Sequence, residues 1–383
     1  MSATPMYDVI VVGLGGVGSA AAWHLARRKA RVLGLDQYPP AHDRGSSHGQ
    51  TRVIRQAYFE HPDYVPLLLR AYDLWRELEQ RQGQKLLFQV GLLQVGPPQG
   101  VVIPGVLRSA AEHRLVVEKL TAAEAHKRFC GFTIPSEMVA VYEPAAGYLL
   151  VEDCVRCALA AAADHGADLR HGVKVCGWQV GNDSVAVHTE QTTYRAARLV
   201  LALGPWSRPL AQLPENVFQV RRKHVYWFAT HAPAYQASAG CPTFLFETPD
   251  GVFYGFPQID AWGVKVAEHS GGVTIDDPSG DPRVADPADQ RRVEAFITRS
   301  LPGVSRTCLR HSVCFYTMSP DEHFVLDFHP FSARVVFAAG LSGHGFKFAS
   351  VLGEALADLA LEGKTSLPIG FLRWSRLPGT WGG

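Results

Sequence analysis

The sequence predicts an α/β fold with two domains, one assembled from separated segments around a mostly parallel sheet and the other rich in antiparallel strands. Three observations lead to this prediction. Strand and helix patterns alternate up to about residue 215, short strands separated by Pro and Gly follow over 216–317, and the strand–helix pattern then returns. A chain of 383 residues is long enough to bury the cores of two joined domains.

The first forty residues form the clearest unit. Residues 7–12 have the apolar pattern of a buried strand, 19–28 that of a helix and 31–35 that of a second strand. Between the first strand and the helix lies a G-x-G-x-x-G pattern made of Gly13, Gly15 and Gly18. Asp36 follows about twenty residues later, where an acidic residue binds the ribose hydroxyls of a dinucleotide. The unit predicts a site for NAD or FAD without choosing between them, and the acid argues against the 2′-phosphate of NADP.

The other elements follow from the spacing of apolar residues. Helical spacing predicts further helices over residues 62–82, 151–165 and 348–361. Runs of apolar and β-branched residues predict strands over 86–96, 139–150, 173–180, 184–188, 197–204, 225–229, 251–256, 263–269 and 334–340.

The hairpin predicted over 251–269 brings three polar side chains to one face. A turn centred on the bond after Ile259 would pair Tyr254 with Lys265, and His269 would share their face because side chains alternate along a strand. Such a face is either the wall of an active site or an ordinary solvated surface.

Composition excludes several classes of partner. Lys and Arg number 37 against 36 Asp and Glu, so no net field attracts a nucleic acid or an anionic membrane surface. The basic run over 221–224 is short, and we expect a solvated strand start there. No apolar stretch approaches the roughly 20 residues of a membrane-spanning helix, and the N-terminus lacks a signal-peptide pattern. These features predict a cytoplasmic protein with no nucleic-acid or membrane partner.

The seven cysteines are odd in number and scattered, which predicts reduced thiols instead of a disulfide framework. Cys154 and Cys157 form a C-x-x-C pattern on the predicted helix over 151–165, but no second pair completes the four ligands of a zinc site. The histidines show no metal-binding spacing. We therefore expect no metal.

Four segments carry a resemblance to one family. They are the glycine-rich N-terminal unit, GSSHGQTRVIRQAY at 45–58, CFYT at 314–317 with SPDEHF at 319–324, and GLSGHGFKF at 340–348. Together they resemble, nearly end to end, the monomeric sarcosine oxidase family, which includes N-methyltryptophan oxidase and pipecolate oxidase. The resemblance implies a monomeric FAD enzyme that oxidises a secondary amino acid, N-methyl or cyclic, with O2 to an imine and H2O2. The imine is then hydrolysed to an aldehyde and an amine.

The resemblance also implies roles for single residues. It implies a flavin bound covalently through Cys314, in a cofactor site that further contains Gly13, Gly15, Gly18, Asp36, Ser46, Thr51, Arg52, Gly343, His344, Gly345 and Lys347. It implies that Arg55 and Lys347 grip the substrate carboxylate, with Tyr316 in the same site. The residues implied in catalysis are Lys265, Arg52, His269, Tyr254 and His48. Among these, Lys265 would supply a positive charge where oxygen is reduced, and Arg52 would lie against the flavin ring.

Two positions depart from the sarcosine and N-methyltryptophan branches of that family. Ser47 and Gln50 stand where those branches usually have His and Asp, and the form found here looks like the pipecolate oxidase branch. The substrate is therefore left open. The alternatives are a flavin dehydrogenase with another electron acceptor, a nicotinamide enzyme that would leave the C-terminal glycine-rich segment unexplained, and a non-catalytic FAD-binding subunit. The retained residues that speak against such a subunit are Arg55, Lys265, Cys314 and Lys347.

Elementary chemistry agrees with parts of this assignment. An Arg side chain binds a carboxylate through two parallel hydrogen bonds, although most arginines are exposed and ion-paired. Lys347 precedes a predicted helix, where unpaired N–H groups and positive potential favour an anion or a flavin edge. Cys314 lies in an apolar strand and by pattern alone would be a small buried hydrophobe. Its neighbours Arg310 and His311 would favour the reactive thiolate.

The resemblance and the sequence pattern together predict how the domains divide. We expect a discontinuous FAD-binding Rossmann-like domain, residues 1–83, 146–215 and 318–383, and an antiparallel-sheet-rich substrate domain, residues 84–145 and 216–317. The flavin would lie between the two domains and accept hydride, or its equivalent, from the substrate carbon.

Overall fold

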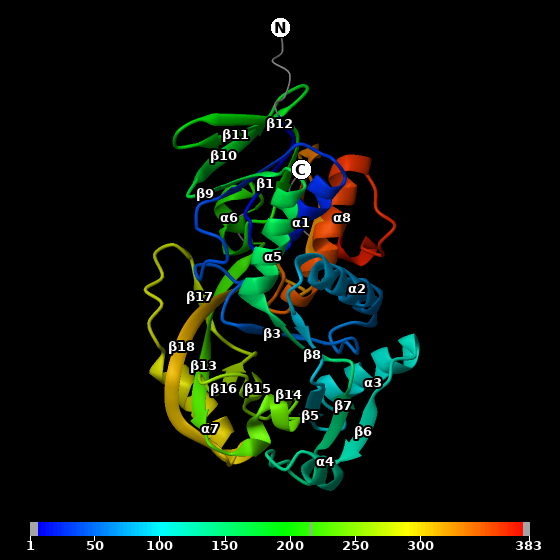
Figure 1. Ribbon diagram of the computed structural model, residues 1–383, viewed down its shortest axis with the longest axis vertical. Coiled ribbons are helices and arrows are strands. Elements are labelled where there is room, and N and C mark those ends of the chain that lie inside the picture. The colour runs from blue at the N-terminus through cyan, green and yellow to red at the C-terminus, as the bar shows by residue number, and fades with distance from the viewer. Residues whose placement is uncertain (1–6, 215–216, 378–383) are drawn as a thin grey trace.

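The first sheet of the protein is built around β1 and lies in the upper half of Figure 1. The computed structural model describes residues 7–214 and 217–377. Within these residues the sheet has five parallel strands, in spatial order β9 (Asp168–His171), β2 (Val32–Asp36), β1 (Tyr7–Val12), β12 (Thr193–Leu201) and β20 (Ser332–Ala339). Antiparallel strands extend it, namely β10 (Val175–Val180), β11 (Val185–Thr189) and β19 (Val325–His329). One sheet thus draws on widely separated parts of the chain.

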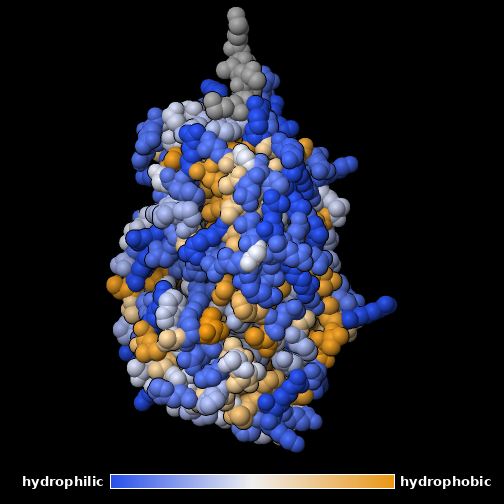
Figure 2. Space-filling model, in the orientation of Figure 1, coloured by the Kyte–Doolittle hydropathy of each residue, from blue (hydrophilic) through white to orange (hydrophobic). Residues whose placement is uncertain are grey.

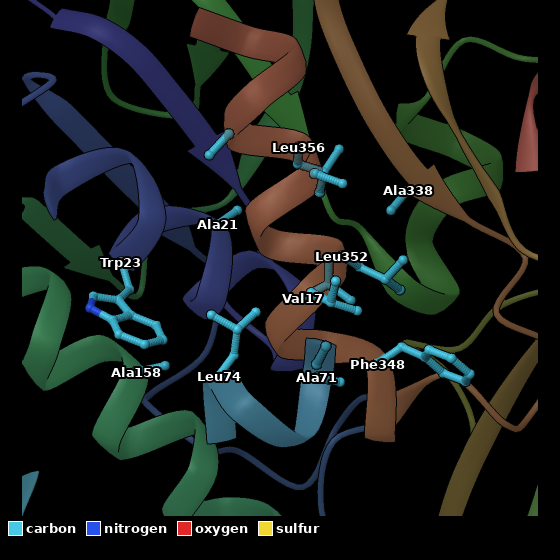
Figure 3. Close-up of a cluster of buried hydrophobic side chains, with 14 of the residues drawn as sticks. Val17, Ala21, Trp23, Ala71, Leu74, Ala158, Ala338, Phe348, Leu352 and Leu356 are labelled. Carbon is cyan, nitrogen blue, oxygen red and sulfur yellow. The ribbon is translucent and has the colours of Figure 1, made fainter. Parts of the chain in front are cut away.

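Four helices pack together against this sheet and share one buried apolar cluster. They are α1 (Gly16–Arg27), α2 (Val65–Gln82), α5 (Val151–Asp164) and α8 (Ala349–Glu362). Figure 3 shows Val17 of α1 beside Leu352 of α8. The two helices approach closely, because a Cβ added to Gly353 would lie 2.6 Å from the backbone of Ala20. This packing fixes where α1 begins, and with it the glycine-rich turn that precedes the helix.

A second, mostly antiparallel sheet lies in the lower half of Figure 1. Within the described residues its main path runs through β17 (Val273–Ile275), β13 (Gln219–Thr230), β16 (Val264–Glu268), β15 (Gly251–Phe256), β14 (Thr243–Thr248), β5 (Leu92–Gly96), β7 (Val139–Glu143) and β6 (Glu118–Thr121). The long strand β18 (Val304–Met318) pairs with β13. Helices α3 (Val102–His113), α4 (Ala122–Arg128) and α7 (Pro287–Ser300) supply apolar residues to its cores.

A small antiparallel sheet lies between the two large sheets (Figure 1). It consists of β3 (Thr51–Ile54), β8 (Gly147–Leu150) and β4 (Leu87–Phe88). Two 3₁₀ turns, Pro62–Tyr64 and Phe346–Phe348, lead directly into α2 and α8. A further short helix, α6 (Ser207–Leu210), follows β12. The predicted mixed α/β fold class is confirmed.

Several elements differ from the prediction. Residues 86–96 form two strands, β4 and β5, because the chain turns at Gly91, whose φ is +81°. Residues 139–150 form β7 and β8, which belong to different sheets. The elements with no predicted counterpart are α3, α4, α6, α7, β3, β6, β9, β14, β17 and β19, most of which are short. The apolar strand expected around Cys314 is part of β18, which is longer because its first half carries exposed polar residues that do not give the pattern of a buried strand.

The hairpin of β15 and β16 has a different register from the predicted one. Tyr254 is opposite Ala267, and Lys265 is opposite Phe256. The register thus differs by two residues, which leaves every side chain on its predicted face, because side chains alternate with a period of two. The rings of Tyr254 and His269 lie 6.2 Å apart on this face.

The basic run over 221–224 is not a solvated strand start, and that prediction was wrong. The run lies inside β13, between β17 and β18, and Lys223 and His224 are 2% and 3% exposed. The Lys223 ammonium group donates to the Ser270 carbonyl at 2.5 Å, and Nδ1 of His224 lies 2.8 Å from Nε2 of His311. Burial lowers the pKa of Lys223 to about 8.

Hydrophilic residues cover most of the face seen in Figure 2, with apolar residues in small groups between them. Among the residues that the structure describes, no helix combines the length and apolar character needed to cross a membrane. The same residues contain no cluster of His, Cys, Asp or Glu that could hold a metal ion. All seven cysteines are free thiols.

Candidate active site

A cavity of about 820 Å³ extends from the glycine-rich turn after β1 to the face of the second sheet. The residues from the sequence assignment that line it are Gly13, Gly15, Asp36, Ser46, Arg52, Arg55, Tyr254, His269, Tyr316, Gly343, His344, Gly345 and Lys347. Those that lie behind its wall are Gly18, His48, Thr51, Lys265 and Cys314. Side chains far apart in the sequence therefore meet around one space, whose volume suits a cofactor together with a small substrate.

The glycine-rich turn has the geometry of a dinucleotide site. Gly13 has a φ of +87°, and a Cβ on Gly18 would lie 1.7 Å from the Gly13 carbonyl oxygen, so neither position accepts a side chain. The following helix begins at Gly16, three residues earlier than predicted, and its first N–H groups have no partner within the helix. Asp36, at the end of β2, accepts hydrogen bonds from the N–H groups of Leu14 at 2.7 Å and Tyr38 at 2.9 Å.

The residues at this end of the cavity fit FAD. The N-terminus of α1 offers N–H groups and positive potential for a pyrophosphate, and the Asp36 carboxylate stands where ribose hydroxyls would bind. Further along the cavity, the buried hydroxyl of Thr317 has no hydrogen-bond partner within the part of the chain that the structure describes. An unpaired buried hydroxyl is costly, and a bound group in the cavity would satisfy it.

At the other end of the cavity, Arg55 lies at the start of a loop, residues 55–60, that is folded around its own arginine. Arg55 is 3% exposed, and its Nη2 lies 2.7 Å from both carboxylate oxygens of Glu60. The guanidinium carbon is 4.1 Å from the ring centre of Tyr58 and 4.4 Å from that of Phe59. Burial would raise the pKa of Glu60, but the charge and hydrogen bonds of Arg55, together with His344 and Lys347, outweigh burial and bring the pKa to about 2. Arg55 is therefore held as a carboxylate-binding group that already has a carboxylate partner.

Lys347 approaches the same loop from the 3₁₀ turn before α8. Its ammonium group donates to the His344 carbonyl at 2.7 Å and lies 3.4 Å from the Tyr58 hydroxyl. Burial, with the nearby charge of Arg55, lowers the pKa of Lys347 to about 7. Burial likewise lowers the pKa of His344 to about 3, so its imidazole is neutral near pH 7. Two buried cationic side chains thus stand at one end of the cavity.

Tyr254, His269 and Tyr316 form the wall on the side of the second sheet. Nδ1 of His269 lies 3.4 Å from the Tyr316 hydroxyl, and their ring centres are 5.6 Å apart. Burial lowers the pKa of His269 to about 4 and raises the pKa values of both tyrosines. All three side chains are therefore uncharged near neutral pH and offer hydrogen bonds instead of charge.

Lys265 lies behind this wall, in contact with the loop that leads into β3. The residue is 1% exposed, and its ammonium group donates to the Gly49 carbonyl at 2.5 Å, the Thr51 carbonyl at 2.9 Å and the Thr51 hydroxyl at 3.2 Å. Burial, together with the charge of Arg52, lowers the pKa of Lys265 well below its usual value. The carboxylate of Glu152 on α5 accepts the Gly49 N–H at 2.7 Å and so fixes the same loop.

Cys314 on β18 faces two basic side chains, His48 in that loop and Arg52 in β3. Nη2 of Arg52 lies 3.2 Å from the sulfur, and Nε2 of His48 lies 3.5 Å from it. Burial raises the pKa of the thiol, but His48 and Arg52 outweigh burial and bring the pKa to about 6. The predicted neighbours were wrong, because His311 pairs with His224 and the Arg310 guanidinium stacks 3.6 Å above Trp262.

Sequence reasoning missed three carboxylates that hold this site together. Glu60 binds Arg55, Glu152 binds the loop beside Lys265, and Glu143 binds the backbone that follows Arg55. A single Glu in a helix, a strand or a loop gives no pattern that separates it from surface acids, so only the fold reveals these contacts.

Comparison with known proteins agrees with this site. Residues 8–359 match the family described as FAD dependent oxidoreductase. The chain is 42% identical to the monomeric sarcosine oxidase of Streptomyces avermitilis, over 98% of each chain. It is 38% identical to the N-methyl-L-tryptophan oxidase of Yersinia pestis, over 95% of this chain and 97% of that one.

Solved structures extend the comparison. NikD, described as an unusual amino acid oxidase essential for nikkomycin biosynthesis, is 29% identical, with a TM-score of 0.84 over 97% of this chain and 98% of the NikD chain. The L-proline dehydrogenase of P. horikoshii, at 21% identity, has the same fold with a TM-score of 0.83 over 96% of this chain and 97% of that one. The chain belongs to the family of FAD-dependent oxidoreductases, in the group that contains the monomeric sarcosine oxidases and the N-methyl-L-tryptophan oxidases.

Proposed function

We propose that this enzyme oxidises secondary amino acids, N-methyl or cyclic ones such as sarcosine or pipecolate, with FAD and O2. One observation carries the proposal: Arg55 and Lys347 present buried positive charge at one end of a cavity whose other end fits a dinucleotide. A substrate carboxylate would take the place of Glu60 on Arg55, because Nη2 of Arg55 already binds both oxygens of a carboxylate there. The sarcosine and N-methyltryptophan oxidases among the relatives support this substrate class.

The chain's own residues would bind and orient the substrate. When bound, FAD would accept hydride from the substrate carbon, and the two electrons with two protons would convert O2 to H2O2. Arg55 and Lys347 would fix the carboxylate, so that the amine end lies beside Tyr254, His269 and Tyr316. Since those three side chains are uncharged near neutral pH, they do not repel a neutral amine or favour its protonated form.

The finer properties of the enzyme are also proposals. We infer a flavin linked through Cys314, supported by the contacts of that thiol with Arg52 and His48. We infer a cytoplasmic monomer, supported by seven free cysteines and by the monomeric oxidases among the relatives. The proposed domain boundaries are those expected from the sequence, since the strands of each large sheet come from the corresponding segments.

An oxygen-electrode assay coupled to peroxide detection tests the activity. Sarcosine, pipecolate and N-methyl-L-tryptophan are compared with glycine, which lacks the N-methyl group, and with dimethylamine, which lacks the carboxylate. We expect one peroxide per O2 consumed with at least one of the secondary amino acids and little turnover of dimethylamine. Turnover of dimethylamine at a rate similar to that of the secondary amino acids would contradict the proposed binding of the substrate carboxylate by Arg55 and Lys347. Substrate-dependent reduction of an artificial dye without O2 consumption would identify a dehydrogenase instead.

The rate of flavin reduction by substrate should rise with pH. The amine must be neutral to lose hydride, and the neutral fraction of a secondary amine grows as pH approaches its pKa of about 10. Stopped-flow measurement of flavin bleaching without oxygen, from mildly acidic to alkaline pH, gives this rate. A flat profile would show that the enzyme accepts the protonated amine and would contradict the proposal.

A further inference from the structure

Glu143, the last residue of β7, reaches from the second sheet to the loop over 55–60. It is 1% exposed. One carboxylate oxygen accepts the Gln56 N–H at 2.6 Å and the other accepts the Ala57 N–H at 3.2 Å. These are the two residues that directly follow Arg55, and the Ala57 carbonyl in turn accepts a hydrogen bond from Nη1 of Arg55 at 3.2 Å. Glu143 therefore acts on Arg55 by holding the backbone that directly follows this arginine.

We propose that Glu143 is a positioning residue for substrate binding, which holds the backbone of residues 56–57 so that Arg55 faces the cavity while its carboxylate partner is exchanged. This inference rests on the proposed role of Arg55. Glu60, the present partner of Arg55, lies three residues beyond Ala57, so it can be displaced while the anchored backbone stays in place. A loop that is already ordered spends less binding free energy on ordering itself when the ligand arrives.

The second domain supports the loop at further points, which shows that the anchor is part of a built contact. The Ser109 hydroxyl on α3 donates to the Tyr58 carbonyl at 2.5 Å and is fully buried. A Cβ on Gly105 would lie 2.6 Å from the Phe59 carbonyl oxygen, so α3 packs directly on the loop backbone. Among these contacts Glu143 alone supplies a charged acceptor, and hydrogen bonds to a charged group are roughly twice as strong as neutral ones.

The strength of this anchor should depend on pH. Burial raises the pKa of Glu143 to about 7, although the Gln56 N–H and the charge of Arg55 oppose the rise. The other titratable group facing it is Tyr72 on α2, whose pKa burial and Glu143 raise, and the neighbouring strand β5 offers the apolar Leu92. The anchoring carboxylate is therefore ionised above about pH 7 and is lost as pH falls below it. Lys347, whose pKa is also about 7, acts in the opposite direction, since it loses its charge as pH rises.

Glu247 provides a matched control, because it holds two successive N–H groups in the same way at another place. Its two carboxylate oxygens accept the Val101 and Val102 N–H groups, each at 2.8 Å, where α3 begins. Glu143→Gln and Glu247→Gln thus make the same chemical change to the same kind of contact. Only the first change touches the loop that carries Arg55.

The test measures binding of methylthioacetate to the FAD-loaded enzyme by the change in flavin absorbance. This acid has sulfur in place of the substrate nitrogen, so it carries the carboxylate, has no titratable amine and cannot form an imine. We expect Glu143→Gln to raise the Kd of the acid about tenfold near pH 8.5. The ratio of the Kd of the variant to the Kd of the wild type should fall toward one near pH 6, where the wild-type carboxyl is mostly protonated. Because Lys347 titrates in both proteins, its effect cancels in this ratio. Glu247→Gln should leave the ratio near one at every pH.

Hydrogen exchange tests the anchor without any ligand. Exchange of the Gln56 and Ala57 amides should be about tenfold faster in Glu143→Gln near pH 8.5, whereas Glu247→Gln should affect only the Val101 and Val102 amides. If Glu143→Gln does not fold, the wild-type enzyme alone tests the anchor. Protection of its Gln56 and Ala57 amides should increase as pH rises through about 7.

Three results would overturn the inference: unchanged exchange at residues 56–57, a Kd ratio that does not vary with pH, or tighter binding of the acid by Glu143→Gln. The first result needs no ligand, so it would overturn the inference whatever the enzyme oxidises. If the acid binds and its Kd ratio varies with pH as expected, but no secondary amino acid is turned over, the proposed function fails and the positioning role stands.

Discussion

Replacing Cys314 with serine should release all of the flavin from the acid-precipitated protein, whereas the wild-type pellet should stay yellow. A covalent bond to the flavin needs a thiolate, and the thiol of Cys314 has a pKa of about 6, since His48 and Arg52 outweigh the effect of burial. A serine hydroxyl in the same place stays protonated and is a much weaker nucleophile. The expected change is therefore complete, from full retention to full release.

Cys308→Ser is the matched control. Cys308 lies on the same strand, its thiol donates to the Arg310 carbonyl at 3.2 Å, and burial raises its pKa. Its substitution should leave the pellet yellow. In apoprotein reconstituted with FAD, the rate of linkage should rise as pH passes upward through about 6 and then level off, since the thiolate forms over that range. A yellow pellet from Cys314→Ser would assign the link to another residue, and a colourless wild-type pellet would show that the flavin is not linked at all.

The parts of this site that could be predicted from the sequence depend on neighbours in the chain. Gly13, Gly18 and Asp36 are fixed by one strand–turn–helix–strand unit, so their spacing alone carries the geometry. Side-chain alternation placed Tyr254 and His269 on one face even though the register was wrong by two residues. Local periodicity survives such an error because it repeats every second residue.

The remainder of the site depends on contacts that no local pattern contains. The thiol of Cys314 takes its basic neighbours from residues 48 and 52, not from residues 310 and 311 beside it in the sequence. Likewise Glu143 reaches the backbone of residues 56 and 57 only because β7 ends beside that loop. The basic run over 221–224 has the composition of a solvated segment, but strands on both sides bury Lys223 and His224. Packing between segments that are distant in the sequence determines all three of these environments, so they could be seen only in the folded structure.

Lys265→Met should slow reoxidation of the reduced flavin by O2 about 10²–10³-fold, while reduction by substrate changes no more than a few-fold. Transfer of one electron to O2 creates superoxide, and a cation already in place, away from water, stabilises that new anion. The ammonium group of Lys265 is fixed by three oxygen acceptors at 2.5, 2.9 and 3.2 Å, and so it needs no rearrangement when the charge forms. Methionine has a similar shape and removes the charge.

Stopped-flow mixing of the reduced enzyme with O2 measures the first rate, and anaerobic mixing with substrate measures the second. Burial and the charge of Arg52 lower the pKa of Lys265, so it loses its charge at a lower pH than an exposed lysine does, and wild-type reoxidation should slow as pH rises. This trend is opposite in sign to that expected for the reductive step. Lys223→Met removes another buried lysine, on the neighbouring strand β13, and should leave reoxidation within a few-fold of wild type. Equal slowing of both half-reactions by Lys265→Met would mean that Lys265 supports the site as a whole and has no particular role toward oxygen.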